Sequence, residues 1–251
     1  MIMRRASNII RSLLFPGLDL HTRNRASLAR YWRSGPRDVL DAGSGNGYFS
    51  WLAYRSGARV VAMNYEQPQV ERSRELLLGV KRADPVRLCF EQRNLYDLKT
   101  ESRRFDEILC FEVLEHLTRD SDVVQEFYRL LRPGGWLHIC CPNKLHPRHQ
   151  REVLDLSESG GHVRAGYTEM DFRSLLEPIG YKLDLVAGIG TPGLYQADRL
   201  LRAIRIHAGD WLALPLLPLA LPFVWLAKEN PAVPFSIYVR AVKPSTGDGA
   251  A

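Results

Sequence analysis

Three glycines stand close together behind an aspartate in the stretch DAGSGNG, residues 41–47. A glycine-rich turn that follows an apolar strand lets the backbone approach a cofactor, because no Cβ atom intervenes. A dinucleotide site requires the pattern G-x-G-x-x-G/A. Here its last small position is Tyr48, and the spacing is G-x-G-x-G. The turn therefore indicates a nucleotide-like cofactor that lacks a pyrophosphate and gains from the carboxylate of Asp41.

The segments that must position this turn alternate between strand and helix patterns. Apolar, β-branched runs predict strands at 38–42, 58–64, 86–92, 105–111, 136–142, 181–189 and 235–243. Amphipathic stretches predict helices at 67–78, with Gly79 as the C-terminal cap, and at 121–131, ended by the PGG that follows. A capping box of Thr168 and Asp171 begins a further helix that Gly180 closes. This alternation predicts a doubly wound α/β domain.

The charge of the chain is concentrated at its N-terminus. The net charge is +6, and residues 1–37 hold eight arginines and one acid, Asp19. We therefore expect a basic amphipathic arm at 1–35, which could meet phosphates or be a solvated helix face, and a main domain at 36–251. The four cysteines lie in strand-like runs without metal-ligand spacing, which favours reduced thiols and a cytoplasmic location.

Four stretches in order resemble the class I S-adenosylmethionine-dependent methyltransferases, in the type 11 branch that includes ubiquinone, saccharide and lipid O-methyltransferases. They are VLDAGSGNG (39–47), FDEILCFEVLEHL (105–117), LLRPGGWLHICCPN (130–143) and GHVRAGYTEMDFRSLLEPIGY (161–181). The resemblance covers about residues 36–190 and the last strand. It implies a Rossmann-like, seven-stranded sheet whose last strand is antiparallel, and S-adenosyl-L-methionine as the cofactor.

The resemblance also implies which residues bind the cofactor. They are Asp41, Gly43, Gly45, Gly47, Asn64, Asn94, Leu95 and Phe111. The family usually has an acid where this chain has Asn64, and commonly an aspartate where it has Asn94. An amide oxygen still accepts a hydrogen bond but lacks the charge that strengthens it, at a cost of about 1 kcal/mol. The two asparagines indicate either tolerated variation or a weakened cofactor site.

Methyl transfer to a hydroxyl needs alignment and a base, and two histidines are candidates for the base. His116 follows the fourth strand, near the expected position of the reactive methyl group, and His162 opens the late acceptor-site loop. The alternatives are packing at a helix start for His116 and a loop-tethering hydrogen bond for His162. His146 and His149 have no evident metal-site partner, and we predict no metal site.

An unusual insertion occupies residues 190–234, before the last strand. Within it, residues 211–227 carry no charge and a tryptophan at each end, but three prolines interrupt the run, so a spanning helix is not expected. A basic amphipathic stretch precedes this run. Residues 199–227 and the arm at 1–15 therefore predict peripheral contact with the cytoplasmic face of a membrane. The alternative is a lid on the domain or a dimer interface.

We accordingly expect methylation of a hydroxyl on an amphipathic or membrane-associated small molecule, such as a quinone precursor or a lipid-linked saccharide. The alternatives are N- or C-methylation of a lipid head group or ring, and a non-catalytic partner subunit with the same fold. A nucleic-acid substrate is not expected, because the chain has no NPPY-like tetrapeptide and no aromatic residues interleaved in its arm. The sequence assigns neither the acceptor nor the oligomeric state.

Overall fold

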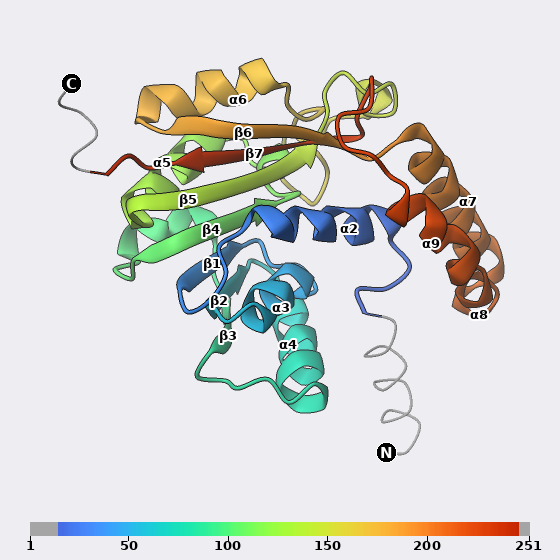
Figure 1. The fold of residues 1–251 in the computed structure, drawn as a ribbon, viewed down its shortest axis with the longest axis horizontal. Helices are drawn as coiled ribbons and strands as arrows, with labels where there is room; N and C mark the ends of the chain where they lie inside the picture. Colours follow the sequence, from blue (N-terminus) through green and yellow to red (C-terminus); the bar gives the residue numbers. More distant parts are fainter. Residues whose placement is uncertain (1–14, 246–251) are drawn as a thin grey trace.

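A seven-stranded mixed sheet forms the centre of the molecule (Figure 1). The computed structural model describes residues 15–245. The strand order is β3-β2-β1-β4-β5-β7-β6, and β7 runs antiparallel to both of its neighbours. The strands are β1 (Asp38–Ala42), β2 (Arg59–Asn64), β3 (Leu88–Gln92), β4 (Phe105–Phe111), β5 (Leu131–Pro142), β6 (Lys182–Ile189) and β7 (Ser236–Val242). The expected doubly wound α/β fold with an antiparallel last strand is confirmed.

The predicted elements match the structure closely, with two corrections. Strand β5 begins at Leu131 rather than at residue 136, because the PGG turn lies inside the strand and the chain bulges against β4 there. The prediction that Gly79 is the C-terminal cap of the helix at 67–78 is also wrong. Gly79 lies within a π-helical turn, Glu75–Val80, that continues α4 (Gln67–Arg74), and Lys81 provides the cap by donating to the carbonyl of Leu76.

The other helices cover both faces of the sheet. They are α3 (Tyr48–Arg55), η3 (Leu95–Thr100), η4 (Leu114–His116), α5 (Asp120–Leu130), η5 (His149–Arg151), α6 (Glu169–Leu176) and η6 (Glu177–Ile179). The predicted capping box of α6 is formed by Thr168 and Asp171, and Gly180 ends η6 in the left-handed region. Both predictions at this helix are confirmed.

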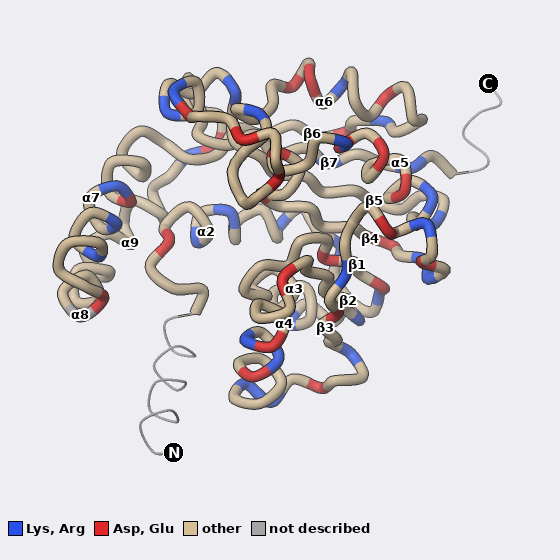
Figure 2. The backbone as a smooth tube through the Cα atoms, turned by 180° about the vertical axis from the view of Figure 1, so that it is seen from behind, with Lys and Arg blue, Asp and Glu red and all other residues tan. Residues whose placement is uncertain are grey.

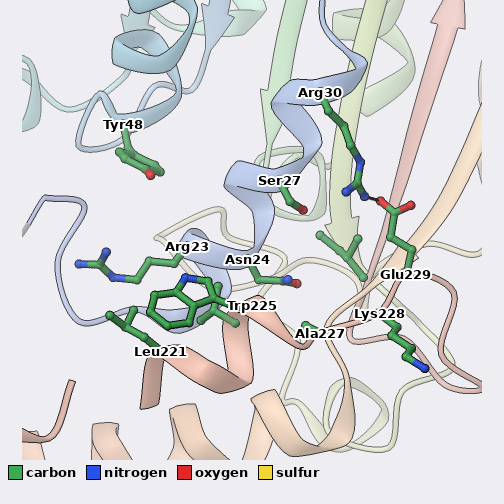
Figure 3. Close-up of a pocket in the computed structure, with 12 residues that line it drawn as sticks. Arg23, Asn24, Ser27, Arg30, Tyr48, Leu221, Trp225, Ala227, Lys228 and Glu229 are labelled. Atoms are coloured by element: carbon green, nitrogen blue, oxygen red, sulfur yellow. Dashed lines mark hydrogen bonds and ion pairs between the residues drawn. The ribbon is translucent and has the colours of Figure 1, made fainter. Parts of the chain in front are cut away.

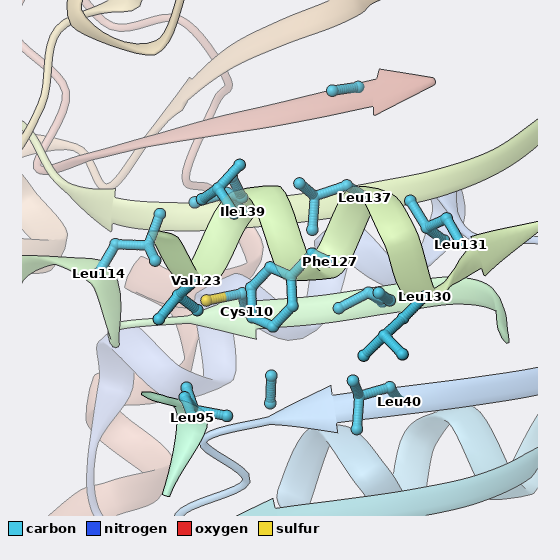
Figure 4. Packing of buried hydrophobic residues seen from close by; sticks show 14 of the residues in the cluster. Leu40, Leu95, Cys110, Leu114, Val123, Phe127, Leu130, Leu131, Leu137 and Ile139 are labelled. Atoms are coloured by element: carbon cyan, nitrogen blue, oxygen red, sulfur yellow. The ribbon is translucent and has the colours of Figure 1, made fainter. Parts of the chain in front are cut away.

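Two apolar clusters fill the layers between sheet and helices. On one face, Phe127 of α5 packs against Cys110 of β4 and Leu137 of β5 (Figure 4), and all three are fully buried. On the other face, the cluster joins Phe90 of β3 and Leu77 with the helices that precede and follow β1. These layers hold the carboxyl ends of β1 to β5 along a single edge, which is where a doubly wound fold places its ligand.

The N-terminal helix α2 (Leu20–Arg25) and the turn η1 (Ala26–Tyr31) precede the sheet. Residues 190–234 form α7 (Pro192–Ala208), α8 (Asp210–Ala213), η7 (Leu214–Leu216) and α9 (Leu217–Trp225), which we call the α7–α9 hairpin. It projects beyond the carboxyl edge beside α2 (Figure 1). A third cluster joins Leu20 of α2 to the inner faces of α7 and α9. None of the helices in residues 15–245 combines the length and apolar character needed to cross a bilayer.

Candidate active site

The glycine turn after β1 has three residues in the left-handed region. Gly43, Gly45 and Gly47 have φ values of 85°, 50° and 79°. A Cβ at Gly43 would stand 2.3 Å from Cγ2 of Val113, and one at Gly47 would stand 2.9 Å from Cδ1 of Leu77. A Cβ at Gly45 would meet nothing within 4 Å. Gly43 and Gly47 are thus required by packing, whereas the backbone at Gly45 faces open space that a cofactor can approach.

Asp41 lies beneath this turn at the end of β1. Its side chain is buried and accepts a hydrogen bond from the hydroxyl of Ser50 in α3. Burial raises the pKa of Asp41 to about 6, and the bond from Ser50 opposes that rise. The residue can therefore carry a charge at neutral pH, at a cost to the folded state.

The two asparagines of the predicted cofactor site lie at the ends of neighbouring strands. Asn64 ends β2, and its Oδ1 accepts a hydrogen bond from the backbone N–H of Glu66 at 2.9 Å. Asn94 follows β3 and caps η3, where its Oδ1 accepts from the N–H of Tyr96 at 3.0 Å. Both amide groups thus shape the local backbone beside the glycine turn. Their contacts with a cofactor stay a prediction.

Leu95 and Phe111, also predicted to bind the cofactor, are nearly covered by protein. Leu95 is 8% exposed and belongs to the cluster around α5. Phe111 ends β4 and packs edge-on against Phe49, with ring centroids 4.7 Å apart. Together with the glycines, Asp41 and the two asparagines, they give the carboxyl edge an open backbone approach, a carboxylate and amide groups. This donor set fits an adenosyl cofactor without a pyrophosphate.

The two histidines predicted as bases come together in the structure. His116 ends η4 and His162 lies in the loop before α6, yet their ring centroids are 4.7 Å apart. His116 Nδ1 donates to the carbonyl of Gly161 at 2.9 Å, and His162 Nδ1 donates to Oε2 of Glu152 at 2.7 Å. These bonds assign both protons to Nδ1, so each neutral ring keeps an unprotonated Nε2. Burial lowers the pKa of His116 below its ordinary value.

The loop that carries His162 is tied to η4. The backbone N–H of Val163 donates to the carbonyl of Glu115 at 2.8 Å. Arg164 pairs with Asp120 at the start of α5 and donates to the carbonyl of Leu117 at 2.7 Å. These bonds place the histidine of the late loop beside the histidine that follows β4, a proximity that the residue spacing does not predict.

Three residues near this site were not singled out from the sequence: Glu112, Arg25 and Glu152. Glu112 follows β4 with a φ of 56°, and Arg25 of α2 pairs with it at 2.6 Å. Glu115 is fully buried, and burial followed by the nearby Glu112 carboxylate raises its pKa well above the ordinary value. Glu152 orients His162. Glu112 stands in the quoted FEVLEH stretch beside Glu115, which the sequence suggests as a residue that holds His116 in place, but no pattern points to Arg25 or Glu152.

Glu115, His116 and His162 also present three atoms of types that ligate metals. These atoms all lie within 4.8 Å of one another. Imidazole and carboxylate are ligands that divalent transition metals accept. The grouping can hold a cation in principle, although no metal site was predicted from the sequence.

A cavity of about 610 Å³ opens at the same edge between α2, α9 and the start of α3 (Figure 3). Arg23, Arg30, Lys228 and Glu229 contribute charge to its walls. Its apolar walls come from Ile189, Leu221, Val224, Trp225 and Ala227. Arg30 pairs with Glu229, and Tyr48 joins the cavity to the glycine turn. The cavity therefore combines a cationic rim with an apolar wall supplied by the hairpin.

Comparison with known proteins finds methyltransferases that resemble part of the chain. A family model described as a methyltransferase domain matches residues 40–139. A protein of Mycolicibacterium smegmatis named as a probable S-adenosylmethionine-dependent methyltransferase is 28% identical over 62% of this chain and 56% of its own length. The ubiquinone biosynthesis O-methyltransferase of Xanthomonas oryzae pv. oryzae is 33% identical over 51% of this chain and 54% of its own. The chain spans about half the length of these curated relatives.

Solved structures share the fold of this chain. The phosphoethanolamine N-methyltransferase 2 of Haemonchus contortus, solved in complex with S-adenosyl-L-methionine, superposes with a TM-score of 0.60 at 16% identity. The match covers 89% of this chain and 53% of that one, and at this identity it shows the fold alone. The family model and the curated relatives together identify residues 40–139 as a methyltransferase domain of the S-adenosylmethionine-dependent kind. Its cofactor is S-adenosylmethionine.

Proposed function

We propose that this protein transfers a methyl group from S-adenosylmethionine to a hydroxyl of an amphipathic small molecule. The observation that carries the hydroxyl assignment is the pair of Glu152 and His162 beside His116. A hydroxyl must lose its proton as the new bond forms, and an oriented imidazole with a free Nε2 is suited to take it.

Some residues of this chain align the cofactor, and others remove the proton of the acceptor hydroxyl. S-adenosylmethionine supplies, when bound, an electrophilic methyl group on a sulfonium. The glycine turn leaves room for it, and Asp41 gives the turn a compensating negative charge. The carboxylate of Glu152 accepts a hydrogen bond from Nδ1–H of His162, which fixes the ring orientation and stabilises the positive charge that the ring gains on taking the acceptor's proton. His116 is the second base candidate, held by Gly161.

The mixed lining of the 610 Å³ cavity supports an amphipathic acceptor. Ligand cavities of about 300–1,000 Å³ with apolar walls and a few polar groups are typical for small molecules. Arg23 and Lys228 supply positive charge, while Trp225 and Leu221 offer an apolar surface. The name of the Xanthomonas relative points to a quinone precursor as one acceptor of this kind.

A methyl-transfer assay with a His162→Gln variant tests the proposal. The wild-type protein is incubated with methyl-labelled S-adenosylmethionine and a prenylated dihydroxybenzoate, and the product is analysed for O-, N- and C-methylation. We expect O-methylation, with kcat reduced by about 10²- to 10⁴-fold in the variant. The affinity for S-adenosylmethionine, measured by calorimetry, should be unchanged.

His207→Gln is the matched control, because His207 is exposed on α7 away from the pair. Label on nitrogen or carbon, or undiminished turnover of His162→Gln, would contradict the assigned base chemistry. Absence of cofactor binding by folded wild-type protein would instead favour the non-catalytic subunit, as Asn64 and Asn94 allow.

A further inference from the structure

The α7–α9 hairpin exposes an unusual number of large apolar side chains. Seven of them are between 47% and 77% exposed: Leu200, Ile206, Leu212, Leu219, Phe223, Trp225 and Leu226. Scattered apolar residues are normal on a surface, but a concentration in one element marks an interaction site.

Three of these exposed side chains, Leu200, Leu219 and Phe223, line a groove between α7 and α9. Its volume is about 430 Å³, and its walls are almost wholly apolar: Gly193, Gln196, Ala197, Leu200, Leu201, Ile204, Leu216, Leu219, Ala220 and Phe223. The inner faces of both helices already pack on α2 through Leu194, Leu201 and Leu217. The hairpin is therefore anchored to the domain independently of the side chains that it presents outward.

Positive charge flanks this apolar surface. Arg199, Arg202 and Arg205 repeat every third residue along exposed positions of α7 (Figure 2), and Lys228 follows the exposed Trp225 and Leu226. Arg202 pairs with Asp198 at 3.1 Å and Arg205 with Asp210 at 3.7 Å. Asp198 is buried, but Arg205 and Asp210 are both exposed, and such a pair is worth only about 0–1 kcal/mol, so a phosphate can replace Asp210 as the partner of Arg205. The pattern is complementary to a surface that is anionic at its face and apolar beneath it.

We propose that the α7–α9 hairpin docks on the surface of a bilayer that contains anionic phospholipid. Helix α9 has only nine residues, with Pro218 in its first turn and Pro222 inside it, and this length suits an element lying in the interface rather than crossing it. Trp225, at the end of α9, has the amphipathic ring that favours the head-group level. The groove is of a size and polarity to take an acyl chain.

Helix α9 also connects this surface to the carboxyl edge of the sheet. Leu219 and Phe223 line the outer groove, while Leu221, Val224 and Trp225 line the 610 Å³ cavity near the glycine turn. Docking would hold the mouth of that cavity near the lipid, so an amphipathic acceptor could reach it without entering water. This last step rests on the proposed function, whereas the docking itself does not.

Vesicle co-sedimentation of the full chain tests the docking without any methyl transfer. Vesicles of phosphatidylcholine with phosphatidylglycerol are compared with phosphatidylcholine alone, at low and high salt. We expect binding to the anionic vesicles that weakens with salt. A Leu219→Gln/Trp225→Gln double variant should lose about tenfold or more in vesicle affinity. Leu156→Gln is the matched control, because Leu156 is 73% exposed but lies outside the hairpin, and it should bind as the wild type does.

Two results would overturn the proposal. The first is undiminished vesicle binding by the double variant, above all if replacing Arg4, Arg5 and Arg11 by glutamine abolished it, since the N-terminal arm would then carry the contact. The second is absence of vesicle binding combined with a dimer in sedimentation velocity that the double variant dissociates. In that case the surface is an interface between two copies. Calorimetry with S-adenosylmethionine on the same samples reports separately on the cofactor site.

Discussion

Strand β4 and helix α9 are both rich in large apolar side chains, but the fold buries one and exposes the other. Six of the seven residues of β4 are buried. In α9, Leu219, Phe223 and Trp225 are 72%, 47% and 73% exposed. Strand β4 has neighbouring strands on both sides and a helix layer over its face, whereas within residues 15–245 helix α9 packs along its inner face and leaves large apolar side chains exposed. Apolar content alone therefore does not distinguish an element that stabilises the domain from one that is available to a partner.

A matched pair of leucine truncations measures this difference directly. Leu137 of β5 is fully buried beside Phe127, so Leu137→Ala leaves a cavity and should cost about 2–5 kcal/mol of unfolding free energy. Leu219→Ala removes a side chain that is mostly in water and should change stability by about 0.5 kcal/mol or less. Urea unfolding of both variants checks the pair, and equal losses would show that the outer face of α9 is covered in solution.

The buried carboxylate of Asp41 carries a charge that opposes folding. Burial raises the pKa of Asp41 in the folded protein to about 6, above its ordinary value of 3.8. The folded state thus binds this proton more tightly than the unfolded state, and stability falls as pH rises through that window, by about 3 kcal/mol in total. Asp41→Asn removes the titrating carboxyl group and with it this loss of stability at rising pH. We expect it to be more stable than the wild type at pH 7 and similar below pH 4.

Unfolding of both proteins by urea between pH 4 and pH 7, without cofactor, tests this sign. Parallel pH dependences would mean that Asp41 is not the group that titrates. The same substitution should weaken binding of S-adenosylmethionine, because the carboxylate beneath the glycine turn is lost. A gain in stability accompanied by a loss of affinity would identify Asp41 as a residue kept for the cofactor rather than for the fold.

The sequence predicts the sheet far better than it predicts the site. Seven apolar runs separated by helical patterns define the order of elements, and the motif at 41–47 predicts a cofactor turn because glycine spacing reports directly on backbone conformation. The PGG turn is harder to assign from sequence, because the same residues can end a helix or form a bulge inside a strand, as they do in β5. The role of Gly79 as a helix cap is wrongly predicted because glycine also occurs inside irregular helical turns, where the packing of neighbouring residues decides its conformation.

The pairing of His116 with His162 depends on tertiary contacts that lie outside any local pattern. Two histidines 46 positions apart in sequence meet because the late loop is tied to η4 through Val163 and Arg164. Arg25 reaches Glu112 for a similar reason, as α2 lies over the carboxyl edge. Local chemistry identified the histidines, but long-range packing determines their partners.

The glycine turn offers a smaller and sharper test of the buried region. Gly43→Ala and Gly45→Ala impose the same kind of backbone strain, because both residues have positive φ. Only the Cβ at position 43 collides with Val113, so Gly43→Ala should be the less stable by about 1–3 kcal/mol. Adding Val113→Ala should recover part of that difference. Gly45→Ala should remain folded but bind S-adenosylmethionine more weakly, since its new methyl group enters the open approach.

The smallest expected effect concerns the orientation of His162. Glu152→Gln keeps a hydrogen-bond acceptor for Nδ1 but removes the charge that stabilises a protonated ring, so we expect kcat to fall about tenfold with KM nearly unchanged. Glu152→Ala should cost more, because the ring also loses its anchor. Glu169→Gln is the control, since Glu169 forms an exposed ion pair on α6. If both Glu152 variants instead raised KM and left kcat intact, Glu152 would be shaping the acceptor loop, and His116 would become the better candidate for the base.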